Sequence, residues 1–386
     1  MKKLKKNEQC EKYNDSISLC NKKTSIGKIQ VKKFDELIEN VIHVPLFNRI
    51  YEIKTEKSHM NIPESLQCDP KFSFVNDGVQ KIITLINLFT YEEVLYNPIR
   101  EKRPGYIYGN DDHVILDEKI SKSKKNCDFC DIENRTASDP WGRIISPSRE
   151  CCVASNIAKY QGYHSMIIPK QHSSIELSLS LIQDLLLTAK QWFDTVNALD
   201  SNAVYPHIMW DNLPRSSASQ YHMHWQVNMR SNRYFGRTQQ LYDAAERYKK
   251  IYESNLLQDI ITVHETLGLA IRCNNVVAMA YITPIKEMEI MIISWSESYE
   301  IFGRMFYLAL EVLFKDMNVR AISCGISLKA YNDNNYPTIA RIINRGGAFD
   351  LRNDVGAMEF YGACNITNDP FVLAKALHDR FKNTTF

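Results

Sequence analysis

The sequence lacks features that mark several large classes of protein. No apolar run approaches the roughly 20 residues that a helix needs to cross a bilayer, so we expect no membrane contact. Lys and Arg (47) nearly balance Asp and Glu (45), which leaves a net charge of only +2. Proteins that bind nucleic acids usually carry a clear excess of positive charge, so we expect no nucleic-acid partner.

We also expect no secretory leader. The N-terminal residues 1–7, MKKLKKN, are basic, but no apolar core follows them. The ten cysteines are scattered over 386 residues, and without a leader we expect them to be thiols or metal ligands rather than disulfides. The sequence therefore predicts a cytoplasmic protein.

What is present is the composition of a folded globular protein. Hydrophobic residues make up 44% of the chain and aromatic residues 11%. A chain of 386 residues can form two domains, or one domain with an internal repeat. We divide it into a loosely attached or disordered N-terminus (1–30), an N-terminal extension (31–126), a first half (127–235) and a second half (236–386).

Helical and strand patterns occur in the same order in both halves. Apolar residues at three- and four-residue spacing predict a helix over about 177–199, with Leu177, Leu181, Ile182, Leu185, Leu186 and Ala189 on its buried face. Further patterns predict helices over 239–258 and 299–316, strands over 276–280 and 289–295, and a polar linker over 121–126. Strands, a helix and strands again in each half predict an α+β fold of two halves packed side by side.

The segment 219–227, SQYHMHWQV, carries the strongest chemical signal. Read as a strand, it sorts into two faces because successive side chains alternate. One face holds His222, His224 and Gln226, and the other holds Tyr221, Met223, Trp225 and Val227. The apolar set predicts a core face. Two imidazoles and an amide suit the binding and attack of a phosphate, because neutral imidazole is a nucleophile near pH 7.

The pattern His-x-His-x-Gln resembles the nucleotidyltransferase branch of the histidine-triad superfamily, which holds galactose-1-phosphate uridylyltransferase and the nucleotide phosphorylases. The resemblance covers about 97–230 and fades beyond it. It implies two tandem histidine-triad-like α+β halves with antiparallel sheets, the second half degenerate. It also implies that His224 is the nucleophile, forming a covalent nucleotidyl-histidine, and that Gln226 hydrogen-bonds the phosphoryl oxygens.

Cys127 and Cys130 form a C-x-x-C pair, which by itself also occurs in redox proteins. In the resembling family, two histidines complete a zinc site with such a pair. The first of these histidines comes after a strand that ends in a proline and two further residues, and it corresponds to His172. The second is the first histidine of the His-x-His-x-Gln motif, which corresponds to His222. The resemblance therefore implies a structural Cys2His2 zinc site, with His164 as a competing ligand.

A basic segment upstream, Arg-Glu-Lys-Arg-Pro, resembles an element in which two arginines contact the nucleotide phosphates. These arginines correspond to Arg100 and Arg103. Guanidinium groups bind phosphate oxygens in a bidentate manner, although a solvated basic turn is the alternative. Asn212 and Ser219 match an Asn and a Ser that precede the histidine motif and contact the phosphates in the same family.

The second half departs from the uridylyltransferases. Residues 335–345 lack the histidines of their second metal site, so we expect no second metal. Trp225 is bulkier than the residue usual there and is more like that of the dinucleoside-polyphosphate and nucleotide-sugar phosphorylases.

The leading hypothesis is a nucleotidyltransferase that passes NMP from a nucleoside-diphosphate sugar to a sugar phosphate or inorganic phosphate, with structural zinc. One alternative is a nucleotide-sugar or dinucleoside-polyphosphate phosphorylase or hydrolase of the same superfamily. Another is a catalytically inactive nucleotide-binding protein, which the degenerate second half favours. The resemblance also suggests a homodimer.

Overall fold

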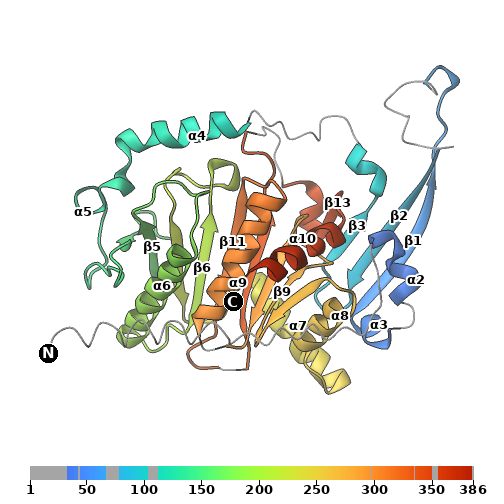
Figure 1. The fold of residues 1–386 in the computed structure, drawn as a ribbon. Coiled ribbons are helices and arrows are strands. Elements are labelled where there is room, and N and C mark those ends of the chain that lie inside the picture. The colour runs from blue at the N-terminus through green and yellow to red at the C-terminus, as the bar shows by residue number, and fades with distance from the viewer. Residues whose placement is uncertain are drawn as a thin grey trace.

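The computed structural model describes residues 33–41, 44–66, 78–102, 112–296, 298–333, 335–349 and 355–384. These residues form two β-sheets with helices packed against them (Figure 1). The predicted N-terminal segment 1–30 and Arg103 lie outside the described residues. Within the described ranges, no helix is both long enough and apolar enough to span a membrane.

The larger sheet has nine strands in the order β4-β5-β7-β6-β11-β12-β10-β9-β8. Its strands are β4 (Cys151–Ser155), β5 (Tyr163–Pro169), β6 (Tyr205–Asp211), β7 (Trp225–Arg230), β8 (Ala270–Cys273), β9 (Val276–Ala280), β10 (Ile290–Ser294), β11 (Ile322–Ser327) and β12 (Thr338–Asn344). Every neighbouring pair is antiparallel.

The sheet contains the same unit twice. In the first half, the chain order is β4, β5, helix α6 (Leu179–Leu199), β6 and β7; in the second half, it is β9, β10, helix α9 (Tyr299–Glu311), β11 and β12. The antiparallel pair β6–β11 joins the two units at the centre of the sheet. The predicted α+β fold of two tandem halves is therefore confirmed.

Helices α6 and α9 pack against each other and cover one face of the nine-stranded sheet (Figure 1). Each is capped at its N-terminus by a serine, Ser178 and Ser298, whose hydroxyl accepts a backbone N–H. The predicted apolar face of α6 is buried from Leu181 to Ala189, and the ring of Trp225 lies 5.9 Å from that of Phe306 in α9. The helical face of the sheet is therefore the hydrophobic core.

Two predicted elements differ from the structure. The helix expected over 239–258 is two helices, α7 (Gly236–Tyr252) and α8 (Leu256–Thr266). Glu253 has a left-handed φ of 52°, which ends α7, and the Asn255 side chain accepts two backbone N–H groups at the start of α8. The linker expected over 121–126 is helical, because α4 (Asp112–Ser123) continues into a 3-10 turn, η7 (Lys124–Asn126).

The N-terminal extension forms a separate four-stranded sheet, on the right in Figure 1, in the order β1-β2-β3-β13. Its strands are β1 (Tyr51–His59), β2 (Val79–Asn87), β3 (Glu93–Tyr96) and β13 (Ala363–Ile366). The pair β3–β13 is parallel, so the C-terminal segment completes this sheet. The remaining helices are η2 (Phe34–Glu36), α2 (Leu37–Val41), α3 (Pro45–Ile50), η3 (Glu64–Leu66), η6 (Pro98–Lys102), η8 (Asp128–Cys130), α5 (Ile132–Arg135), η9 (Pro214–Ser216), η10 (Val312–Asp316), η11 (Ala357–Tyr361) and α10 (Pro370–Asn383).

A buried ion-pair cluster joins the extension to the second half. Glu92, next to β3, accepts from Arg341 of β12 at 2.7 Å and from Arg237 of α7 at 3.0 Å. Glu289 also pairs with Arg341, and the Tyr281 hydroxyl donates to Glu92 at 3.0 Å. Burial alone would raise the pKa of Glu92, but the two guanidinium groups outweigh it and hold that pKa below its usual value.

We expect Glu92→Gln to lower the free energy of unfolding by about 3 kcal/mol, because breaking a buried pair leaves a charge uncompensated. The matched control is Glu150→Gln, whose partner Lys170 lies 3.6 Å away on the surface. That change should cost less than about 1 kcal/mol. Urea unfolding followed by circular dichroism measures the free energy of unfolding of both variants. Equal losses of stability in E92Q and E150Q would contradict the role of the cluster.

Candidate active site

The histidine motif lies where the chain enters β7. The sequence pattern predicts a strand over 219–227, but the ladder of β7 begins at Trp225, so His222 and His224 lie just before the observed strand. The alternation nevertheless persists, because Met223, Trp225 and Val227 are buried in the core. His224 and Gln226 are thereby directed to the opposite face of the sheet from α6 and α9.

The ring of His224 is held in one tautomer. Its Nδ1 lies 2.9 Å from the backbone oxygen of His222. A carbonyl oxygen only accepts hydrogen bonds, so Nδ1 carries the proton and Nε2 carries the lone pair. Burial lowers the pKa of His224, which keeps the ring neutral at pH 7. The arrangement presents a neutral imidazole with its Nε2 lone pair available for attack on an electrophile.

The carboxamide of Gln226 is oriented by two side chains of the preceding turn and strand. Its Oε1 lies 3.0 Å from Nε2 of His164 and accepts a hydrogen bond from the Tyr160 hydroxyl at 3.3 Å. With Oε1 engaged, the amide N–H groups are the end that can donate to a phosphoryl oxygen. No sequence pattern pointed to Tyr160, which lies in a loop, four residues before His164.

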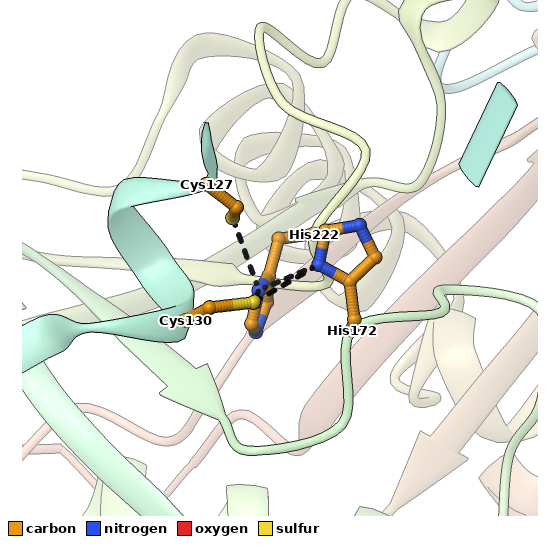
Figure 2. A group of neighbouring side chains, drawn as sticks. All are labelled: Cys127, Cys130, His172 and His222. Atoms are coloured by element: carbon orange, nitrogen blue, oxygen red, sulfur yellow. Dashed lines mark hydrogen bonds between the residues drawn. The ribbon is translucent and has the colours of Figure 1, made fainter. Parts of the chain in front are cut away.

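The four predicted metal ligands meet at one point (Figure 2). Cys127 precedes the 3-10 turn η8 and Cys130 ends it, His172 follows β5, and His222 precedes β7. Their ligand atoms all lie within 4.8 Å of one another, and among the described residues this is the group found suited to a metal ion. Cys127 Sγ is 3.4 Å from His222 Nδ1, and Cys130 Sγ is 3.4 Å from His172 Nδ1.

Both imidazoles direct an unprotonated nitrogen at the centre of this group. The Nε2 of His222 donates to the backbone oxygen of Pro169 at 2.7 Å. The hydroxyl of Ser123 gives its proton to Ile120 O, so it accepts from His172 Nε2 at 2.9 Å. The two Nδ1 lone pairs then face each other at 3.1 Å, which is unfavourable unless a cation lies between them. The group fits a tetrahedral metal ion.

The chemistry of the cysteine thiols also favours a bound cation in this group. Burial and the neighbouring Cys127 raise the pKa of Cys130 to about 11, so the Cys130 thiol does not ionise at neutral pH without a positive charge nearby. A bound cation supplies that charge and displaces the protons. His164, the competing ligand, is directed to Gln226 instead.

Asn212 is buried and holds the loop before the motif in place. Its Nδ2 donates to Arg320 O at 2.7 Å, and its Oδ1 accepts from Ile322 N at 2.8 Å. The polar loop therefore starts from a fixed point on β11, turns through η9, and reaches the exposed Ser219. These contacts give Asn212 a positioning role in the structure, while Ser219 is open to a ligand.

Arg100 lies in η6, which follows β3 of the smaller sheet. Figure 1 shows this sheet at the opposite end of the molecule from β5. The structure therefore does not bring Arg100 together with His224, and its predicted contact with the phosphates stays a prediction. Two further histidines, His207 and His264, are buried in the core, where both ring nitrogens of each are hydrogen-bonded to the backbone.

We expect the purified wild-type protein to contain one metal ion per chain and Cys127→Ser to lose it, because the mutation removes one of four ligands. The control is Cys152→Ser, a half-buried cysteine of β4 outside the group. Elemental analysis gives the stoichiometry, and a chelator should lower the melting temperature of wild type and C152S only. Retention of metal in C127S would contradict the assignment.

Comparison with known proteins supports the fold. No family model and no curated protein matches the chain. Among solved structures, an ADP-glucose phosphorylase from Arabidopsis thaliana with bound ADP-glucose superposes with a TM-score of 0.60 and 16% identity, over 77% of this chain and 98% of that one. A GalT-like protein from Arabidopsis thaliana superposes with a TM-score of 0.54 and 17% identity, over 66% of this chain and 92% of that one. A uridylyltransferase mutant superposes with a TM-score of 0.50 and 14% identity, over 64% of this chain and 90% of that one.

These likenesses concern the fold, since the identities are below 20%. The resemblance that the histidine motif suggested is thus confirmed at the level of architecture. The chain has the fold shared by the uridylyltransferase, GalT-like and ADP-glucose phosphorylase structures.

Proposed function

We propose that the protein is a nucleotidyltransferase that transfers NMP from a nucleoside-diphosphate sugar to a phosphate acceptor through a nucleotidyl-His224 intermediate. The observation that carries this proposal is the His224 ring, buried and neutral, with Nδ1 bound to His222 O. This geometry leaves Nε2 as a nucleophile beside the oriented amide of Gln226.

The reaction has two displacements. In the first, the Nε2 lone pair attacks the α-phosphorus, an N–P bond forms, and the bond to the bridging oxygen breaks. The sugar phosphate leaves with that electron pair. In the second, a phosphate oxygen of the acceptor attacks the same phosphorus, the N–P bond breaks, and its electron pair returns to Nε2. Such a sequence predicts ping-pong kinetics.

Two hydrogen bonds act on charge that develops during these steps. The bond from Nδ1–H to His222 O strengthens as the ring becomes positive, so the carbonyl stabilises the intermediate. The Gln226 amide donates to a non-bridging phosphoryl oxygen, where negative charge builds up in the transition state. Tyr160 and His164 hold that amide in place beforehand.

We infer that the metal is zinc, because two cysteines and two histidines form the tetrahedral set that zinc prefers. When bound, it supplies a structural crosslink between η8, the end of β5 and the segment that leads into β7. Arg100, Arg103, Asn212 and Ser219 remain candidates for phosphate binding. We also infer the division into 1–30, 31–126, 127–235 and 236–386, with the nine-stranded sheet continuous across the last boundary.

Incubation with a nucleoside-diphosphate sugar and no acceptor should add the mass of one NMP to the wild-type protein. His224→Ala should show no increment, because it removes the nucleophile. His59→Ala, at an exposed histidine of β1, should behave as wild type. Intact-protein mass spectrometry of wild type, H224A and H59A after incubation with UDP-, ADP- or GDP-glucose measures the increment, and its mass identifies the nucleotide. An increment on H224A would exclude His224 as the nucleophile.

Gln226→Ala should lower kcat by about 10²- to 10³-fold, the usual loss when one oxyanion donor is removed. Gln226→Glu keeps the size but replaces the donor with an acceptor, so it should be at least as slow. Tyr160→Phe removes one of the two contacts to Oε1 and should have a smaller effect. Steady-state rates measure these differences, and equal rates for Q226A and wild type would contradict the role of the amide.

A further inference from the structure

A cavity of about 280 Å³ lies away from the histidine motif, and we call it the α4–α9 cavity. It is found where the first turns of α4 meet the end of α9 and the turn η10 (Figure 1). The segment 175–177, which leads into α6, forms a third wall, and Arg320, which precedes β11, contributes a fourth. Neither His224 nor Gln226 lines this cavity, so it is separate from the candidate active site.

Arg320 contributes a cation that has no anionic partner among the described residues. Its Nε donates to His113 Nδ1 at 3.0 Å, and its Nη1 donates to the backbone oxygen of Phe314 at 3.2 Å. A ring nitrogen that accepts a hydrogen bond carries no proton, so both partners are uncharged. Burial lowers the pKa of Arg320, and the charge of Asp117 offsets this only in part. A half-buried guanidinium with uncharged partners is suited to bind an anion.

Two carboxylates also line the cavity. Within the described part of the chain, Asp117 of α4 and Glu176 have no hydrogen bond or ion pair. Asp117 lies near enough to Arg320 to act on its pKa, yet the two do not form an ion pair. Glu311 of α9, in contrast, is paired with Lys315. The cavity therefore presents a cation and carboxylates that are close together and not neutralised by each other.

The rest of the lining is largely apolar. Leu116 of α4, Leu310 of α9 and Phe314 of η10 line the cavity and are buried. The turn η10 is π-helical, with a hydrogen bond of 2.9 Å from Met317 N to Val312 O. Such turns often occur at functional sites. An apolar cavity with a few charged groups is typical of a site for a small molecule.

Two walls of the cavity are hydrogen-bonded to Asn212, where the loop before the histidine motif starts. The backbone oxygen of Arg320 accepts from Asn212 Nδ2 at 2.7 Å, and the Ser174 hydroxyl donates to Asn212 O at 2.6 Å. The next residue, Leu213, belongs to the same apolar cluster as Leu116. A ligand that fixes these walls therefore restrains the loop that leads to the motif.

We propose that the α4–α9 cavity binds a free α-amino acid with an apolar side chain, and that the bound molecule restrains the loop 213–221. An α-amino acid carries a carboxylate and an ammonium group on one carbon, which match the neighbouring charges of Arg320 and Asp117. Its side chain contacts Leu116, Leu310 and Phe314. A simple carboxylate or amine would leave one of the lining charges unmatched. The site does not depend on the nucleotidyl transfer proposed for His224.

Isothermal titration calorimetry of the wild-type protein with L-leucine, L-isoleucine, L-methionine and L-phenylalanine tests the site directly. We expect at least one of the four to bind. Two analogues of L-leucine test its charges, because 4-methylpentanoate lacks the ammonium group and 3-methylbutylamine lacks the carboxylate. Both should bind at least about tenfold more weakly than L-leucine. Binding by none of the four amino acids, or equal binding of either analogue, would overturn the assignment.

Arg320→Gln should weaken binding of the tightest amino acid by about 10- to 100-fold, because the carboxylate loses a charged donor. The backbone oxygen that Asn212 binds is retained. Asp117→Asn should weaken binding by about threefold, since this carboxylate is exposed. The matched control is Arg304→Gln, whose partner in α9 is Glu300 and which lies outside the cavity. R304Q should bind as wild type does.

Melting temperatures show whether each variant is folded. If R320Q does not fold, the comparison of L-leucine with its two analogues decides on wild type alone. Wild-type affinity in a folded R320Q, or an equal loss in R304Q, would overturn the site.

Hydrogen–deuterium exchange measures the restraint on the loop. A saturating amino acid should slow exchange of the backbone N–H groups of 213–221 in wild type and in R304Q, and the same concentration should not do so in R320Q. Unchanged exchange in saturated wild type would overturn the link between the cavity and the loop. Neither measurement uses a nucleotide, so failure of NMP loading on His224 and failure of this inference are observed separately.

Discussion

One residue, His222, links the candidate metal-binding group to His224, the proposed nucleophile. The His222 side chain directs Nδ1 at Cys127 and Cys130, while its backbone oxygen accepts the Nδ1 proton of His224. Anything that displaces the His222 ring therefore also displaces the carbonyl that sets the His224 tautomer. A metal ion held by His222 would in this way fix the protonation of His224 Nδ1, a nitrogen that it does not bind.

The two halves of the sheet show how one architecture carries two different sites. The strand pairings align four residues in one row across the sheet, in the order Gln226, Met209, Gly325 and Arg341. The row is symmetric about the central pair Met209–Gly325, so Gln226 in the first half and Arg341 in the second occupy equivalent places. Gln226 is half-buried and carries an uncharged carboxamide. Arg341 is buried and is neutralised by Glu289 and Glu92. The second half therefore has a buried ion pair, which anchors the N-terminal extension, at the place where the first half has the proposed phosphate-binding amide.

Local patterns predicted the elements that depend on periodicity alone. The α6 pattern from Leu181 to Ala189 is buried as expected, because three- and four-residue spacing places these side chains on one face wherever the helix packs. The break at Glu253 was missed, since a charged residue in a helical composition gives no signal of a left-handed φ. The contacts of Asn212 with the backbone of Arg320 and Ile322 were not predicted either, because these partners are more than 100 residues away in the sequence.

The sequence by itself determined the chemistry that is available: which residues can act as nucleophile, amide donor and metal ligands, and the α+β pattern in two halves. Residue type and spacing contain that information, because alternation along a strand and the ligand preferences of metals are local properties. Only the tertiary structure decided the tautomer of His224, the contacts of Tyr160 and His164 with Gln226, and the convergence of the four candidate metal ligands. Each of these depends on the registration of strands that are distant in the sequence, which no short segment specifies.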